Sequence, residues 1–374
     1  MLLVYLDHDL GLHRPEHLTI PYESGRVLDD GSCTEIRVVT RSSDAEVALP
    51  ANFSTVFCNG HRKLLTKIFM LSRLLKLWSK YPKANLIIHN DPMVACLLLV
   101  LNLIALRKES RLIFRVTHLI EESKLESETR FFVRLAARIR IFFRKFAVRY
   151  CSKTFVTSRA MQAYFSTKDP RADIVVLPAT IDFSKYVDDS NLHKDLPEGK
   201  VKIFLYVGTA SDQRGFEEIF DFFHRNELFN CKFKVIFASR PTDTVCSILS
   251  NVVALGIEVE QHVGVAEEVI TQVMSGADFG FANYPSTNPC YFNSPIKILQ
   301  YYAMGIIPVI SQNPHCMELA LEVGSFRWLT PEVPGVFDEC VISDRQLITS
   351  KIETLRQAYD ASYVYSGYIR DAIL

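Results

Sequence analysis

Short runs of apolar or β-branched residues alternate with longer amphipathic stretches through the first half of the chain. Such short runs indicate buried strands, whereas apolar positions that recur every three or four residues indicate helices. By this criterion we predict strands at residues 2–6, 35–40, 54–58, 85–89, 111–117, 153–157 and 174–177. Helices are predicted between them at residues 62–81, 92–106, 129–150 and 158–165. This alternation predicts an α/β fold with a parallel sheet covered on both faces.

A polar stretch at residues 182–200, with Pro197 and Gly199, interrupts the pattern and suits a connection between domains. A second series of strands follows at residues 201–207, 232–238, 252–259, around Asp278, and at 307–310. The chain has 374 residues, more than one hydrophobic core usually supports. We therefore predict two domains, at residues 1–185 and 186–355. A C-terminal helix over residues 356–374 is expected, with a return to the first domain as an option.

Charge separates the two halves. The whole chain carries 42 Lys and Arg against 42 Asp and Glu, but residues 51–150 hold 19 against 6. A neutral protein thus contains one basic domain. Two predicted helices, at residues 62–81 and 129–150, combine this charge with apolar stripes, as helices attached to anionic lipid do. The alternative is that the stripes cover the sheet and the cations are solvated. Nucleic acid is not expected, because no known binding module accompanies the charge.

Nine scattered cysteines, without a C-x-x-C pair or zinc spacing, favour reduced thiols in the cytoplasm. No cleavable signal peptide is expected, since the first apolar run meets Asp7 without a basic flank. Residues 93–106 are too short to span a bilayer and contain Asn102, so a buried helix is predicted there. These features place the protein in the cytoplasm, with attachment to the inner face of the cell membrane as an option.

Residues 294–311, SPIKILQYYAMGIIPVIS, are the most informative segment. Ser294 is a good N-cap, Pro295 suits the first helical position, and Lys297 adds a cation beside the positive end of the helix dipole. Backbone N–H groups at such a helix start bind phosphates. The segment therefore predicts an anion site, and the alternative is a capped structural helix with a solvated lysine.

Residues 205–216 form a second candidate, in which a strand ends at Gly208 and a helix begins near Phe216. Arg214 lies where its guanidinium can hold an anion above the sheet. The alternative is an ordinary tight turn with a solvated arginine. A dinucleotide-binding dehydrogenase is disfavoured, because no G-x-G-x-x-G follows an early strand.

Three polar groups follow strands of the first domain. His118 comes at the end of the 111–117 strand, where α/β proteins bind ligands, although a histidine satisfied within the fold is the alternative. Asp91 is predicted to cap the helix at 92–106, with acceptor contact as the lesser option. Residues 7–9, Asp-His-Asp, are interpreted as a loop after the first strand and not as a metal site.

The 294–311 segment resembles the donor-binding signature of family 4 glycosyltransferases, S-P-x-K-x-x-E-Y-x-A-x-G-x-P-V-V. The match comprises Ser294, Pro295, Lys297, Tyr301, Ala303, Gly305 and Pro308. Two acids of the family are replaced, by Gln300 at the ribose-binding position and by Phe292 eight residues earlier. A glutamine can still accept a ribose hydroxyl bond, without the charge assistance of a carboxylate. The resemblance covers residues 200–312 well and the first domain only by the order of its elements.

The resemblance implies a GT-B fold, with two Rossmann-like domains facing across a cleft. It also implies a retaining glycosyltransferase that uses a nucleotide-diphospho-sugar and no metal, with a glycan or lipid-linked acceptor, as in bacterial surface polysaccharide or glycolipid synthesis. Thr209 occupies a position that is arginine in many members, and Arg214 matches the second cation of the phosphate loop. His118 would face the donor sugar. The implied catalytic residues are His118, Arg214 and Lys297, and the implied donor-binding residues are Gly208, Thr209, Arg214, Ser294, Pro295, Lys297 and Gln300.

Two other classes of function stay open. The departures at Gln300, Phe292 and Thr209 would suit a degenerate glycosyltransferase that binds a partner without turnover. The basic helices would suit a non-catalytic protein that binds a membrane surface or a nucleic acid.

Overall fold

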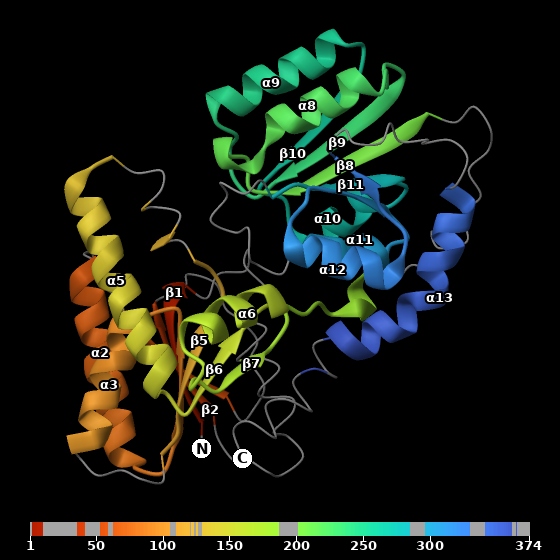
Figure 1. Ribbon diagram of the computed structural model, residues 1–374. Helices are drawn as coiled ribbons and strands as arrows, with labels where there is room; N and C mark the ends of the chain where they lie inside the picture. Colours follow the sequence, from red (N-terminus) through yellow and green to blue (C-terminus); the bar gives the residue numbers. More distant parts are fainter. Residues whose placement is uncertain are drawn as a thin grey trace. The chain divides into compact units, whose positions relative to one another are not determined.

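The chain folds into two compact units in the computed structural model (Figure 1). Unit 1 comprises Met1–Thr180 and Ala361–Leu374, and unit 2 comprises Ile181–Asp360. The structure describes residues 2–9, 36–41, 53–58, 63–104, 110–119, 121–122, 125, 129–186, 201–284, 296–329, 341–360 and 364. The predicted connection at residues 182–200 therefore lies mostly outside the described residues. The same holds for most of the helix predicted at residues 356–374.

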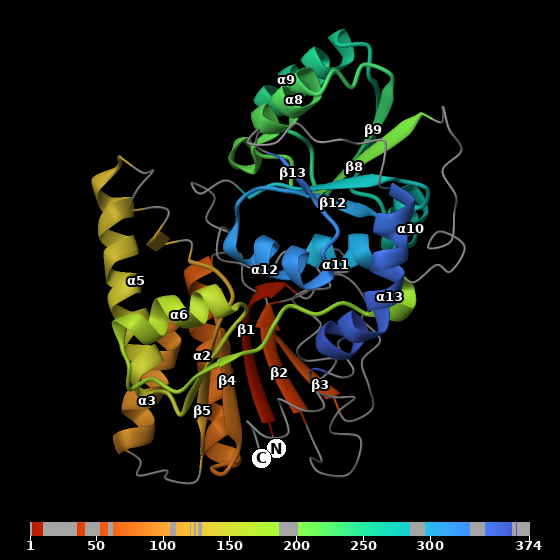
Figure 2. The same cartoon turned by 45° about the vertical axis from the view of Figure 1, so that its right-hand side comes forward.

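Unit 1 contains a seven-stranded parallel sheet in the order β3-β2-β1-β4-β5-β6-β7. Its strands are β1 (Leu2–Asp9), β2 (Ile36–Arg41), β3 (Phe53–Cys58), β4 (Asn85–His89), β5 (Leu112–Val116), β6 (Lys153–Val156) and β7 (Ile174–Val176). The helices between them are α2 (Lys63–Lys80), α3 (Pro92–Ile104), α5 (Phe131–Tyr150) and α6 (Arg159–Lys168). Figures 1 and 2 both show α2, α3 and α5 together on one side of this sheet.

The central strands of unit 1 are mostly apolar and buried, and the burial includes His89 and Arg115. All five residues of β5 are buried, as are four of the five in β4. Helix α2 covers the sheet with Met70, Leu74 and Trp78, and the indole N–H of Trp78 donates to Ser110 Oγ over 3.2 Å. Asp91 caps α3 as predicted, since its Oδ1 accepts from the backbone N–H groups of Met93 and Val94.

Unit 2 contains a six-stranded parallel sheet in the order β10-β9-β8-β11-β12-β13. Its strands are β8 (Lys202–Gly208), β9 (Cys231–Phe237), β10 (Glu258–Val263), β11 (Phe279–Ala282), β12 (Ile307–Ile310) and β13 (Arg327–Trp328). The helices are η2 (Phe183–Lys185), η3 (Asp212–Arg214), α8 (Phe216–Arg225), α9 (Asp243–Ala254), α10 (Glu267–Met274), α11 (Ile296–Ala303), α12 (Pro314–Val323) and α13 (Val341–Tyr359).

Aromatic rings fill the core of unit 2. Phe204 of β8 stacks on Phe279 and Phe281 of β11, with ring centroids 5.1 and 5.7 Å apart. Phe222 and Phe223 of α8 meet the same cluster edge-on. Such pairs contribute about 0.5–1.5 kcal/mol beyond their buried area. This packing fixes α8, and with it the turn that precedes α8, against the middle of the sheet.

The predicted class, α/β with two Rossmann-like halves, is confirmed, and three local predictions are wrong. The helix predicted to be buried at residues 93–106 is exposed along one side of α3, at Met93, Leu97, Val100, Leu103 and Ile104, because apolar composition does not require burial on every side. The strand predicted at residues 252–259 is divided between the end of α9 and the start of β10, because apolar runs at a helix end look like a strand in sequence. Asp7–Asp9 belong to β1 and are not a loop, since Asp9 pairs with Arg41 of β2 through backbone bonds that polar residues also form. Within the described residues, no helix is long and apolar enough to cross a membrane.

Candidate functional site

The strand order of unit 2 places a switch point beside β8. The chain adds β9 and β10 on one side of β8 and then returns to add β11 on the other side. In open parallel sheets, ligands bind at the carboxyl ends of the strands on either side of such a point. Here these ends are Gly208 of β8 and residues 282–284 after β11.

Lys297 lies at this point, in the first turn of α11. Its side chain is only 7% exposed, and its Nζ lies 4.3 Å from the ring centroid of Tyr206 and 5.0 Å from that of Tyr284. Gly208 has φ +145, and a Cβ there would lie 3.5 Å from Lys297 Nζ. Glycine therefore provides a backbone conformation that other residues rarely adopt and leaves the ammonium group open toward the turn.

Arg214 approaches the ring of Tyr284 from the segment between β8 and α8. It ends η3, and its Cζ lies 5.7 Å from the ring centroid of Tyr284. The turn is held by Asn283, whose Nδ2 donates to the carbonyl of Gly215 over 2.8 Å. A Cβ on Gly215, at φ +64, would come within 2.1 Å of that amide, so only glycine fits. The structure thus brings Arg214 and Lys297 together at Tyr284, with Gly208 beside Lys297.

Gln300 lies one helical turn after Lys297. Its Nε2 donates to the hydroxyl of Tyr186 over 2.7 Å. Tyr186 is buried and follows η2. Because the amide nitrogen bonds to Tyr186, the side chain can present Oε1 as an acceptor.

Among the other predicted donor-binding residues, the structure describes Thr209 but not Ser294 or Pro295. Thr209 is exposed, and its backbone carbonyl accepts from the hydroxyl of Tyr206 over 2.9 Å. Ser294 and Pro295 lie outside the described residues, as does Phe292. Helix α11 is described from Ile296 onward, so the predicted helix start at Ser294 and Pro295 stays a prediction.

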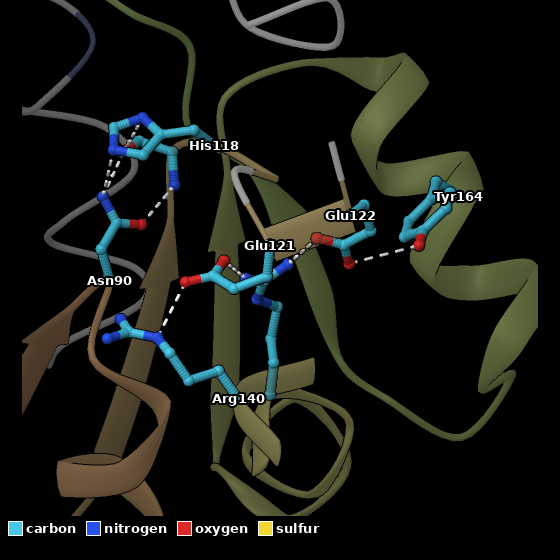
Figure 3. A network of polar contacts seen from close by, with 8 residues as sticks. Asn90, His118, Glu121, Glu122, Arg140 and Tyr164 are labelled. Carbon is cyan, nitrogen blue, oxygen red and sulfur yellow. Dashed lines mark hydrogen bonds and ion pairs between the residues drawn. The ribbon is translucent and has the colours of Figure 1, made fainter. Parts of the chain in front are cut away.

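His118 belongs to unit 1, where it follows β5 and is half-buried. Figure 3 shows its ring beside Asn90, whose Nδ2 lies 3.2 Å from His118 Nε2. Its Nδ1 lies 2.9 Å from Thr117 Oγ1, and the Asn90 Oδ1 accepts from the backbone N–H of Thr117. Which ring nitrogen donates in these contacts depends on the tautomer of His118. The carboxyl ends of β4 and β5 therefore fix the orientation of His118, and its role toward a sugar stays a prediction.

A buried ion network lies close to His118 in unit 1 (Figure 3). Arg144 of α5 is buried and pairs with both Glu121 and Glu122, while Arg140 pairs with Glu121 at 2.8 Å. Burial raises the pKa of Glu122 and lowers the pKa of Arg144 to about 10. The network attaches α5 to the segment after β5, which explains why one of the many arginines of this helix faces inward.

Sequence reasoning missed four residues of the unit 2 site, namely Tyr186, Tyr206, Asn283 and Tyr284. Tyr206 and Tyr284 lie at strand ends next to the predicted cations, so the strand-end rule that selected Gly208 could have found them. Asn283 is fully buried, and its Oδ1 has no hydrogen-bond partner among the described residues. Tyr186 is distant in sequence and carries no local signal.

Solved structures resemble the whole chain, whereas no protein-family model and no curated protein sequence matches it. The structure of WaaG, a glycosyltransferase involved in lipopolysaccharide biosynthesis, matches with a TM-score of 0.67 at 12% identity, over 100% of this chain and 99% of that one. Sucrose-phosphate synthase from Thermosynechococcus elongatus matches with a TM-score of 0.65 at 12% identity, over 100% and 95%.

A third structure is that of "Trehalose-6-phosphate from E. coli bound with UDP-2-fluoro glucose". It matches with a TM-score of 0.63 at 10% identity, over 99% of this chain and 98% of that one. At these identities the likeness concerns the fold. The chain therefore has the GT-B fold seen in glycosyltransferase structures, as the sequence resemblance implied.

Proposed function

We propose that this chain is a glycosyltransferase of the family 4 type, retaining and metal-independent, that uses a nucleotide-diphospho-sugar as donor. The observation that carries the proposal is the convergence of Lys297 and Arg214 on Tyr284, beside Gly208 at the switch point of unit 2. The sequence resemblance and the GT-B fold point to the same site.

Two cations at this place suit a diphosphate. Lys297 is largely removed from water, and a charge interaction is stronger in such surroundings than in bulk solvent. The guanidinium of Arg214 can bind two phosphate oxygens at once. In the proposed complex, the diphosphate lies over Gly208 against these cations and the start of α11 at Ser294 and Pro295, next to Thr209, and Gln300 accepts from the ribose hydroxyls.

In the transfer step, the bond between the anomeric carbon and the diphosphate oxygen breaks. The electron pair stays on the diphosphate, where Lys297 and Arg214 stabilise the growing charge without a metal. An acceptor hydroxyl bonds to the anomeric carbon on the face that the diphosphate leaves, and its proton passes to the departing oxygen. We propose that His118, oriented by Asn90 and Thr117, positions the sugar.

The proposed acceptor is a glycan or a lipid-linked saccharide, handled on the cytoplasmic side of the cell in bacterial surface polysaccharide or glycolipid synthesis. Support comes from the sequence resemblance and from WaaG, which is described as acting in lipopolysaccharide biosynthesis.

A thermal-shift panel of UDP-, GDP- and TDP-sugars tests donor binding. At least one nucleotide should stabilise the protein, and Lys297→Ala and Arg214→Ala should each weaken its binding about tenfold or more, the scale of a lost charge-assisted hydrogen bond. Lys351→Ala, at an exposed lysine of α13, is the matched control and should bind as the unaltered protein does. Unchanged affinity in both site variants would remove the basis for the diphosphate site.

A degenerate transferase that binds without turnover is the second candidate, favoured by Gln300, Phe292 and Thr209. Mass spectrometry of the donor after incubation separates the two. Release of free sugar and nucleoside diphosphate, or transfer to a glycan mixture, supports an enzyme. Tight binding with an intact donor under all conditions supports the degenerate form.

A further inference from the structure

Helix α5 presents its apolar stripe to solvent. Apolar side chains at 131, 132, 135, 139, 142, 146 and 150 are all exposed, with Phe132 at 80% and Phe142 at 65%. At 3.6 residues per turn they occupy one sector of roughly 100°. The buried positions Ala137, Arg144, Ala147 and Val148 lie on the opposite side. The apolar stripe of α5 therefore does not cover the sheet. The alternative in which the stripe packs on the sheet and only the cations face solvent does not hold for this helix.

Cations occupy the sector next to this stripe. Arg134, Arg138, Lys145 and Arg149 are exposed and follow one edge of the apolar sector along the whole helix. Helix α5 thus has three sides, of which one packs inward, one is apolar and outward, and one is cationic. An ordinary surface helix buries its apolar side and exposes its charges.

Helix α3 extends the apolar surface. It packs against α5, and the thiol of Cys96 donates to the backbone carbonyl of Phe143 over 3.1 Å. Its exposed residues recur every three to four positions, at Met93, Leu97, Val100, Leu103 and Ile104. We refer to the exposed apolar residues of the two helices, with the four cations of α5, as the α3–α5 face. A patch with this many large exposed apolar side chains is uncommon unless it binds something.

Charge indicates what the α3–α5 face binds. Helices α2, α3 and α5 contain no Asp or Glu, whereas α2 contains five Lys and Arg and α5 contains six. A second copy meeting this face would place like charges together without an acid on these helices to pair them. An anionic lipid bilayer complements both properties, because acyl chains receive the rings and phosphates receive the cations.

A pocket adjoins the α3–α5 face. It measures about 480 Å³ and lies between the second half of α5 and α6. Phe142 and Phe146 line it together with four cations, Arg144, Lys145, Arg149 and Lys168, and two acids, Glu122 and Asp169. Asp169 pairs with Arg149 over 3.7 Å and Glu122 pairs with Arg144, so the cations outnumber the acids by two. Aromatic rings beside several cations suit the phosphate and upper glycerol region of a lipid. The pocket thus favours a lipid surface over a purely apolar partner.

We propose that the α3–α5 face docks unit 1 on an anionic bilayer, with the rings of Phe132 and Phe142 in the lipid and the α5 cations among the phosphates. Docking through these side chains holds the chain at the membrane surface. The inference rests on unit 1 alone and does not depend on the proposed donor site in unit 2.

Vesicle co-sedimentation tests the proposal. The full chain should bind vesicles of phosphatidylcholine with 30 mol% phosphatidylglycerol much more tightly than pure phosphatidylcholine, and added salt should weaken binding. Arg134→Ser with Arg138→Ser should lower the partition coefficient about 30-fold, since each cation near the surface is worth roughly a factor of five. Phe132→Ser with Phe142→Ser should lower it at least about tenfold. Leu321→Ser, at an exposed leucine of α12, is the matched control.

Fluorescence tests which residues enter the lipid. Trp78→Phe with Trp328→Phe removes both tryptophans of the chain. In this background, Phe142→Trp should shift its emission to the blue on vesicles and be quenched by brominated lipid, while Leu321→Trp should remain unquenched. Circular dichroism confirms that each variant folds.

Three results would overturn the proposal. They are equal binding to neutral and anionic vesicles, folded phenylalanine variants that bind as the unaltered protein does, and a dimer of the chain in light scattering that the phenylalanine variants abolish while vesicles remain unbound. Nucleotide binding is measured in parallel, so loss of the donor hypothesis and loss of membrane docking are distinguishable.

Discussion

The Tyr186 hydroxyl accepts a hydrogen bond from Gln300, the residue that stands where family 4 glycosyltransferases carry an acid. Because the Gln300 amide nitrogen donates to Tyr186, the carbonyl oxygen can act as an acceptor, and in the proposed complex it accepts from the ribose. Tyr186→Phe removes the acceptor of that bond. We expect it to weaken nucleotide binding about two- to tenfold, the range for one neutral hydrogen bond, by isothermal titration calorimetry.

The control for this prediction is the ligand. A 2′,3′-dideoxynucleoside diphosphate cannot donate to Gln300, so its affinity should be the same in Tyr186→Phe, in Gln300→Ala and in the unaltered protein. Gln300→Glu should raise affinity for the ribonucleotide only, because a carboxylate accepts hydroxyl bonds more strongly. A uniform loss for both ligands would show that Tyr186 merely supports the fold.

Gly208 can be tested against a second glycine at positive φ. Gly208 has φ +145 and Gly264 has φ +62, and a Cβ on Gly264 would meet nothing within 4 Å. Each change to alanine should cost about 1–3 kcal/mol of stability in chemical unfolding. Only Gly208→Ala should also reduce nucleotide affinity, since its methyl group would lie beside Lys297. Equal affinity losses in both variants would argue against a phosphate position over Gly208.

The predicted site residues that lie near one another in unit 2 share one property, which is a local signal. Gly208, Arg214 and Lys297 each stand at a strand end or helix start that the sequence pattern reveals, and the structure brings them together. Tyr186 has no such signal, and the contacts of Tyr186 with Gln300 and of Asn283 with Gly215 join segments more than 60 residues apart. Only packing of the whole unit makes those contacts.

At the scale of elements, α13 is anchored to the sheet of unit 2 by a buried ion pair. Arg345 Nη2 lies 2.9 Å from Asp278 Oδ1, and Asp278 Oδ2 accepts from the backbone N–H of Ile203 at the start of β8. Removing one partner leaves the other charge buried. Arg345→Ala should therefore destabilise unit 2 by about 3–5 kcal/mol in urea unfolding.

Arg345→Ala with Asp278→Asn tests the cause of that loss. The double variant should recover part of the stability, because no unpaired charge remains buried. Lys351→Ala on the exposed side of the same helix should change stability by less than about 0.5 kcal/mol. If Arg345→Ala were equally mild, the pair would contribute nothing to anchoring the helix.

Helices show where apolar periodicity misleads. The stripe of α5 has the spacing of a helix that covers a sheet, yet the structure buries Ala137, Ala147 and Val148 and leaves the phenylalanines outside. Periodicity marks the sides of a helix but does not say which side is inward. Small residues opposite the stripe were the available signal, since they permit close approach of α5 to α3.

At the scale of the whole molecule, the two units have separate sheets and separate tryptophans. Trp78 lies in α2 of unit 1, and Trp328 lies in β13 of unit 2. The variants Trp78→Phe and Trp328→Phe thus each leave one fluorescent reporter for one unit.

A nucleotide at 100 times its dissociation constant stabilises the unit that binds it by about 2.7 kcal/mol. We expect the Trp328 transition to rise by about 5–10 °C, given the size of unit 2, while the Trp78 transition stays within about 1 °C. Lys297→Ala should abolish the shift at Trp328. A shift seen only by Trp78, or equally by both reporters, would contradict a nucleotide site confined to unit 2.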